Sequence, residues 1–234
     1  MAVVAPRWAA AGLLVVALGA GVTPAPAGSV EDKLIPLERY STPKARALGS
    51  SHQQHLLKYS EYVYGCLPWL DVQKSSIGFQ RPKFAEGDER YFSTWIIVDQ
   101  KDDPEFAKIP QARRMSAMFS RFGMDLMRRM ATIHDVVTDD NVQGFSVVTS
   151  WLKPGSLAPG SQPVNESIAV FVDKKSALDY MERRITAADL TTKARWLAFD
   201  GQKELPNLPL EIWDDFFMAT YKVPNYDPPP GTTC

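Results

Sequence analysis

The 234-residue chain has little cysteine, almost no net charge and none of the common catalytic motifs. Lys and Arg total 26 against 27 for Asp and Glu, so a net charge of −1 gives no electrostatic basis for a nucleic-acid partner. No G-x-S-x-G, Walker loop, H-E-x-x-H or EF-hand loop occurs. These absences exclude the enzyme classes that such motifs define. They favour a non-catalytic binding or structural module with no cofactor, whose partner is a small molecule or a protein.

The N-terminus has the pattern of a secretory signal peptide. Arg7 precedes an uncharged, mostly apolar run at 8–22, and an Ala-x-Ala triplet ends at Ala27. We expect cleavage between Ala27 and Gly28, with an uncleaved anchor as the alternative. The run is shorter than the ~20 residues that span a bilayer as a helix, and no later segment is long and apolar enough to do so. The expected protein is soluble and is exported to the bacterial periplasm or beyond.

Only two cysteines occur, Cys66 and Cys234. Export places them in an oxidising compartment, where an even count favours a disulfide. A Cys66–Cys234 bridge would tie down the proline-rich tail at 227–234. The alternative is a buried free Cys66 with Cys234 in a loose tail. The chain has no C-x-x-C, which argues against a thiol redox enzyme.

Hydrophobic periodicity predicts one α+β domain over 49–226, after a polar, proline-punctuated linker or N-terminal arm at 28–48. Gly49, Ser50 and Ser51 are expected to cap a first helix that ends near Gly65 or Pro68. The clearest helix is predicted near 110–136, and Asp173 is expected to cap another. Alternating or β-branched segments predict strands at 91–99, 145–152, 167–173, 194–199 and 216–223.

The order of these elements from residue 91 is strand, helix, strand, strand, helix, strand. It matches the ferredoxin-like β-α-β-β-α-β core, an antiparallel sheet with helices mainly on one face. The helix after residue 49 and the strand at 216–223 would be additions to that core. Such folds serve enzymes, carriers and binding modules, so the predicted topology does not select a function.

The three histidines suggest a metal-dependent hydrolase as an alternative function. Two of them are three residues apart on a predicted helix, a spacing that lets both bind one ion. The candidate ligands are His52, His55, His134 and Asp135, with Asp139 or Asp140 as the last. The competing interpretation is a pair of surface histidines with His134 at a helix C-terminus.

Five methionines on the predicted long helix suggest a periplasmic copper-handling protein, since thioether sulfur is a soft ligand for copper(I). They are Met115, Met118, Met124, Met127 and Met130. Core packing is the favoured interpretation, because methionine fills irregular gaps and several of these share a stripe with phenylalanines. Arg128 and Arg129 would also place positive charge beside a copper site.

Five tryptophans remain after signal removal: Trp69, Trp95, Trp151, Trp196 and Trp213. A line of them on one sheet face would bind an apolar or sugar ligand, although large aromatics more often fill the core. Ser150 and Lys153 fit the S-x-x-K pattern of penicillin-recognising enzymes. They lie on a predicted strand, where their side chains point to opposite faces, so this chemistry is not expected.

Overall fold

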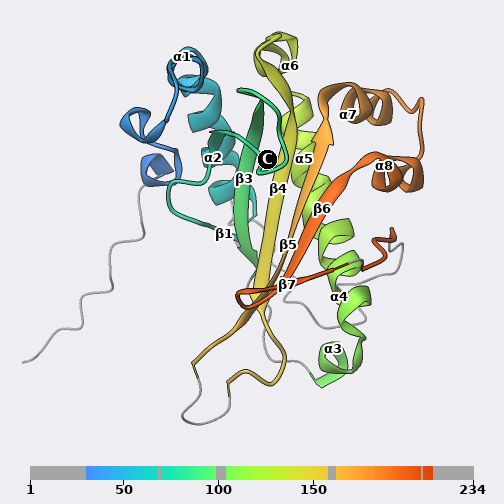
Figure 1. The fold of residues 1–234 in the computed structure, drawn as a ribbon. Coiled ribbons are helices and arrows are strands. Elements are labelled where there is room, and N and C mark those ends of the chain that lie inside the picture. The colour runs from blue at the N-terminus through green and yellow to red at the C-terminus, as the bar shows by residue number, and fades with distance from the viewer. Residues whose placement is uncertain (1–29, 68–69, 99–103, 158–161, 207, 213–234) are drawn as a thin grey trace, which may run out of the picture.

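The computed structural model describes residues 30–67, 70–98, 104–157, 162–206 and 208–212. These residues form helices and a mixed, mostly antiparallel seven-stranded sheet, so the fold class is α+β (Figure 1). The strands are β1 Leu70–Val72, β2 Gly78–Gln80, β3 Arg90–Val98, β4 Val142–Leu152, β5 Asn165–Asp173, β6 Arg195–Asp200 and β7 Lys203–Leu205. The helices are η1 Val30–Lys33, η2 Leu37–Arg39, α1 Pro43–Ser51, α2 Gln53–Cys66, α3 Pro104–Lys108, α4 Gln111–Met118, η3 Phe119–Gly123, α5 Met124–Ala131, α6 His134–Thr138, α7 Lys174–Met181 and α8 Ala187–Lys193.

The strands lie in the order β1-β3-β4-β5-β6-β7, and β2 pairs with β3. Strands β3 and β4 are parallel, and every other pair is antiparallel. A ferredoxin-like core is a split β-α-β unit, in which another strand separates the two that the first helix connects. Here β3 and β4 pair directly, so the observed order differs from that predicted core. The strand expected at 216–223 lies outside the described residues.

Four predicted strands are confirmed as β3, β4, β5 and β6. Successive side chains of a strand point to opposite faces, so Phe92, Thr94 and Ile96 of β3 share one face. The Phe92 ring lies 5.3 Å from the ring of Tyr59 in α2, which places this face against the helices. Aromatic and β-branched residues occur on both faces of this segment, which predicts a strand covered on both sides. That prediction is wrong for the other face at Trp95, which is 41% exposed.

The segment expected to be a linker at 28–48 contains η1, η2 and the start of α1. The side chain of Tyr40 is only 4% exposed, and its hydroxyl accepts a hydrogen bond from the Phe79 amide at 3.2 Å. Thr42 caps α1 by accepting from the Ala45 amide. Residues 49–51 therefore end α1 and do not cap α2, which begins at Gln53. Contact of Tyr40 with β2 therefore orders this segment, although its polar, proline-containing composition predicted a linker.

The predicted helix at 110–136 is divided into α4, the π-helical turn η3, and α5, with α6 as a separate helix. The turn ends at Gly123, where an added Cβ would lie 2.7 Å from the Phe119 ring and 3.5 Å from the Thr149 hydroxyl of β4. Absence of a side chain at Gly123 therefore leaves room for the Phe119 ring of the same turn, while the contact with β4 would be of ordinary length. Figure 1 shows α4 and α5 crossing the strands on one side.

Glu166 of β5 lies fully buried at the junction between the sheet and α4. Its carboxylate accepts hydrogen bonds from Arg114 Nε at 2.9 Å and from Arg114 Nη2. It also accepts from Trp151 Nε1 at 2.9 Å and from Gln111 Nε2 at 3.0 Å. The Arg114 guanidinium also donates to the Ile109 carbonyl. Both members of this buried charge pair therefore have hydrogen-bond partners beyond each other.

The predicted cap at Asp173 is confirmed, because its carboxylate accepts from the Ser176 amide at 2.8 Å. The pair Asp200 and Gly201 is a typical turn sequence, and the structure has a turn there. Gly201 has a φ of 60° between β6 and β7, a conformation that favours glycine. Within the described residues, no helix combines the length and apolar character that a bilayer span requires.

Candidate functional site

A groove of about 850 Å³ lies on the sheet face opposite Phe92 and Thr94. Residues from β3, β4, β5 and β6 form its floor, and the segments near residues 80–83 and 163–165 form its rim. The large apolar side chains of the floor are Trp95, Ile97, Val148, Phe171, Leu197 and Phe199. The volume falls within the ~300–1,000 Å³ typical of small-molecule sites, which makes this groove the candidate site.

Trp95 is the most exposed aromatic side chain of the groove floor, and hydrogen bonds fix its position. Its indole Nε1 donates to the Ser150 hydroxyl of β4 at 2.8 Å. Its backbone amide donates to the Ser76 hydroxyl at 3.3 Å, and its carbonyl accepts from the Gln73 amide at 2.9 Å. The turn between β1 and β2 thus holds the Trp95 backbone, while Ser150 holds the ring.

The buried hydroxyls of the floor are already hydrogen-bonded within the protein. Ser93 donates to the Tyr91 carbonyl at 3.1 Å and lies 2.5 Å from the Ser146 hydroxyl. The Ser150 hydroxyl is the acceptor for Trp95. Because these groups have partners, the floor presents mainly apolar surface to a ligand.

The charged residues at the groove are cations. Arg81 and Lys83 line it and are exposed, and no Asp, Glu or His occurs among its described lining residues. The Arg81 guanidinium donates to the Ala85 carbonyl at 2.8 Å, which orients it. Within the described part of the chain, neither cation forms an ion pair.

A second, polar pocket of about 340 Å³ adjoins the groove at Phe171, which lines both. Its charged residues are Glu86, Glu89, Asp173, Lys193 and Arg195. The Phe84 ring stands at 90° to the Phe171 ring at 5.1 Å, and the Arg195 guanidinium lies 4.7 Å from the Phe84 centroid. Burial, with a smaller effect of Glu89 and Asp173, raises the pKa of Tyr91 beside them. Glu86, Glu89 and Asp173 thus line the polar pocket together with the cations Lys193 and Arg195.

The residues named for metal hydrolysis form two separate His–Asp pairs. His52 Nε2 lies 2.9 Å from Asp139 Oδ2, and His55 Nε2 lies 3.0 Å from Asp135 Oδ2. The two rings are 6.0 Å apart. His134 is exposed at the first position of α6, so it is at a helix start and not at the C-terminus expected. Among the described residues, no three His, Cys, Asp or Glu side chains are placed to hold one metal ion.

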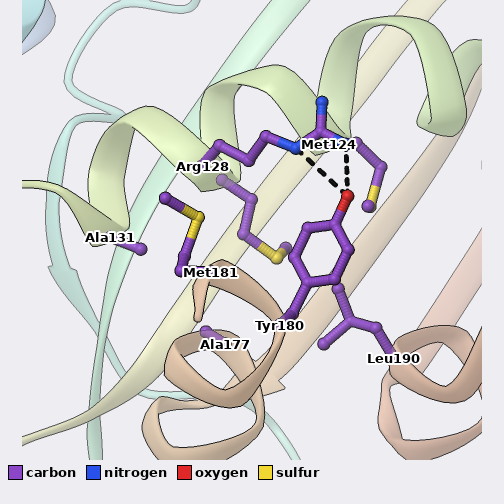
Figure 2. Close-up of a pocket in the computed structure, with 8 residues that line it drawn as sticks. Met124, Arg128, Ala131, Ala177, Tyr180, Met181 and Leu190 are labelled. Carbon is purple, nitrogen blue, oxygen red and sulfur yellow. Dashed lines mark hydrogen bonds between the residues drawn. The ribbon is translucent and has the colours of Figure 1, made fainter. Parts of the chain in front are cut away.

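The methionines proposed for copper are buried, and two of them, Met124 and Met127, lie among side chains of α5, α7 and α8. Figure 2 shows Met124 and Met181 on either side of Tyr180, whose hydroxyl accepts hydrogen bonds from Arg128. The space between these side chains does not admit a water molecule. The methionines Met115, Met118, Met124, Met127 and Met130 are each at most 3% exposed. This arrangement supports core packing, with the charge of Arg128 beside the cluster.

Lys153 is engaged elsewhere than with Ser150. Its ammonium donates to both carboxylate oxygens of Asp200 at 2.8 Å, and this hydrogen bonding holds the pKa of Asp200 below its usual range.

Of the five tryptophans, Trp151 is fully buried and Trp196 is partly buried, whereas Trp69 and Trp213 lie outside the described residues. Trp95 is therefore the tryptophan on which the hypothesis of a ligand-binding sheet face depends.

Cys66 is buried at the end of α2, and Cys234 lies outside the described residues, so the disulfide stays a prediction.

The sequence pointed to Trp95 only as one of five tryptophans. It missed Arg81 and Lys83, because no local pattern shows that they meet the sheet. Comparison of the chain with protein-family models, with curated proteins and with solved structures finds no match.

Proposed function

We propose that the protein is an exported, non-catalytic binding module that holds a small ligand with an apolar body in the sheet-face groove. The observation that carries this proposal is Trp95, a large apolar side chain left 41% exposed within a groove of ligand size. Its indole is held by Ser150, so the surface is formed before a ligand arrives. Placement of the helices mainly on the opposite face is the arrangement that would keep this surface available.

The chemistry of the groove supports binding over catalysis. No carboxylate or imidazole is found among the described residues that line it, so a general base is not supplied there. The hydroxyls of Ser93 and Ser150 are bonded to neutral groups and have no base to activate them as nucleophiles.

Export and the Cys66–Cys234 disulfide belong to the same proposal. A signal peptide at 1–27 would deliver the chain to an oxidising compartment, where the bridge forms. Intact mass of protein from its native host should lack residues 1–27, and thiol titration after denaturation without reductant should find no free cysteine. A mass that includes Met1, or two free thiols, would contradict these parts of the proposal.

The binding function is tested with N-phenyl-1-naphthylamine, a neutral apolar probe that fluoresces more strongly in apolar surroundings. We expect saturable binding with one site per chain. Trp95→Ala should weaken it about tenfold or more, because loss of one buried large apolar side chain costs ~1.5–3 kcal/mol. The matched control is Leu157→Ala, which removes a 54% exposed apolar side chain outside the groove.

Circular dichroism of each variant checks that the fold is retained. Absence of saturable binding to the wild type would refute the proposed function. Equal affinities of the wild type and Trp95→Ala would show that the probe binds elsewhere and would refute the assignment to this groove.

A further inference from the structure

We infer that the ligand of the groove is an amphipathic carboxylate, whose apolar chain lies on Trp95 and whose carboxylate binds between Arg81 and Lys83. This inference rests on the proposed binding function and specifies its ligand class. It joins two observations: the large side chains of the floor are apolar, and the charged side chains among the described lining residues are both cations.

Charge complementarity selects an anionic head group. Arg81 and Lys83 are the charged side chains among the described lining residues of the groove, and neither has a carboxylate partner in the described part of the chain. An incoming anion thus meets two cations and no like charge at the groove itself. The nearby carboxylates Glu86, Glu89 and Asp173 line the polar pocket with Lys193 and Arg195.

Geometry favours a carboxylate as that head group. One guanidinium nitrogen of Arg81 donates to the Ala85 carbonyl at 2.8 Å, which orients the planar group on the rim. A guanidinium has five N–H donors, and its planar fork matches the two oxygens of a carboxylate. Lys83 adds a second cation two residues away, whose flexible side chain follows the bound head group.

The floor suits an apolar ligand chain, because its large side chains are apolar and its buried hydroxyls already have partners. The hydroxyls of Ser93 and Ser150 are engaged with Tyr91, Ser146 and Trp95. An alkyl chain laid on this part of the floor gives up no hydrogen bonds to water, whereas the hydroxyls of a sugar would have to pair with other lining side chains, such as Gln73, Asn165 and Ser167. Burial of the chain against Trp95, Leu197 and Phe199 supplies the apolar contact.

The test compares decanoate with decanol, which share a ten-carbon chain and differ in head-group charge. Isothermal titration of the full mature chain is done at pH 7.5, below the micelle concentration of decanoate. We expect decanoate to bind about tenfold more tightly than decanol, because each exposed cation contributes modestly in a high-dielectric setting. Added salt should weaken decanoate binding and leave decanol binding nearly unchanged.

The double variant Arg81→Gln/Lys83→Gln should bind decanoate about as weakly as decanol and should keep the wild-type affinity for decanol. The control Lys74→Gln removes an exposed cation outside the groove and should keep the decanoate preference. Equal affinity of the wild type for both compounds refutes the carboxylate inference and leaves the binding function intact. A preference that survives in the double variant refutes the role of Arg81 and Lys83. If neither compound nor the neutral probe binds, the proposed function itself is refuted.

Discussion

Replacement of Glu166 by leucine tests whether the buried charge pair holds α4 to the sheet. The carboxylate is fully buried and accepts from Arg114, Gln111 and Trp151, so its loss leaves the Arg114 cation facing the Ile109 carbonyl alone. Removal of one partner of a buried ion pair costs about 3–5 kcal/mol, because the other charge stays desolvated. For a chain of this size, the loss corresponds to a fall in melting temperature of about 6–20 °C.

The assay is urea unfolding at pH 7, followed by far-UV circular dichroism and tryptophan fluorescence. The double variant Arg114→Met/Glu166→Leu should be less destabilised than the sum of the two single variants, with a coupling of about 0.5–3 kcal/mol. A residual cost of about 1–3 kcal/mol should remain, because the Trp151 indole N–H loses its acceptor.

The matched control is Arg121→Ala, which breaks an exposed pair with Asp125 one helical turn away. It should change the free energy of unfolding by no more than about 0.5 kcal/mol. An unchanged unfolding midpoint for Glu166→Leu, or strict additivity in the double variant, would refute the reasoning.

Three further predictions concern other parts of the fold. Burial raises the pKa of Asp139, but hydrogen bonds from His52 and Asn141 outweigh it and hold the pKa below its ordinary value. This carboxylate therefore stabilises the fold above the unfolded Asp pKa of about 3.9, and the contribution is lost as pH falls further. Acid unfolding of Asp139→Asn should show a shallower pH dependence than the wild type, and parallel curves would contradict this. Gly144→Ala should destabilise by about 1–3 kcal/mol in urea unfolding, because its Cβ would lie 2.3 Å from the Val172 carbonyl oxygen; an unchanged midpoint would refute that clash. Met130→Ala should cost about 2–5 kcal/mol, and copper(I) should not raise the melting temperature of the wild type; copper-dependent stabilisation that Met130→Ala abolishes would instead indicate a metal site.

The central strands were predictable because their side chains carry the periodicity of buried sheet. Phe145, Val147, Thr149 and Trp151 alternate along β4, and all four are buried in the structure. The cap at Asp173 was predictable for a similar reason, since capping depends on residues only three apart. Signals of this kind act over short sequence distances.

Features that depend on contacts between distant residues were not predictable. The hydrogen bond from Phe79 to Tyr40 orders a segment that composition alone describes as a linker. The direct pairing of β3 with β4 depends on how the helical connection crosses the sheet, which strand patterns do not encode. For the site, alternation in β3 separates Trp95 from Phe92, but it does not tell which of the two faces the helices cover.

The order of the strands also bears on how the chain folds. From β3 onward each strand pairs with the next along the chain, and β6 joins β7 through the turn at Gly201 and Gln202. Antiparallel pairing of β4 to β7 needs shorter loop closures than the parallel pairing of β3 with β4, which spans the helical crossover from Val98 to Val142. We therefore expect β4 to β7 to assemble first and β3, which carries Trp95, to join late. The groove would then be among the last features to form. In a variant that keeps Trp95 as its single tryptophan, the fluorescence change on refolding should report this final step.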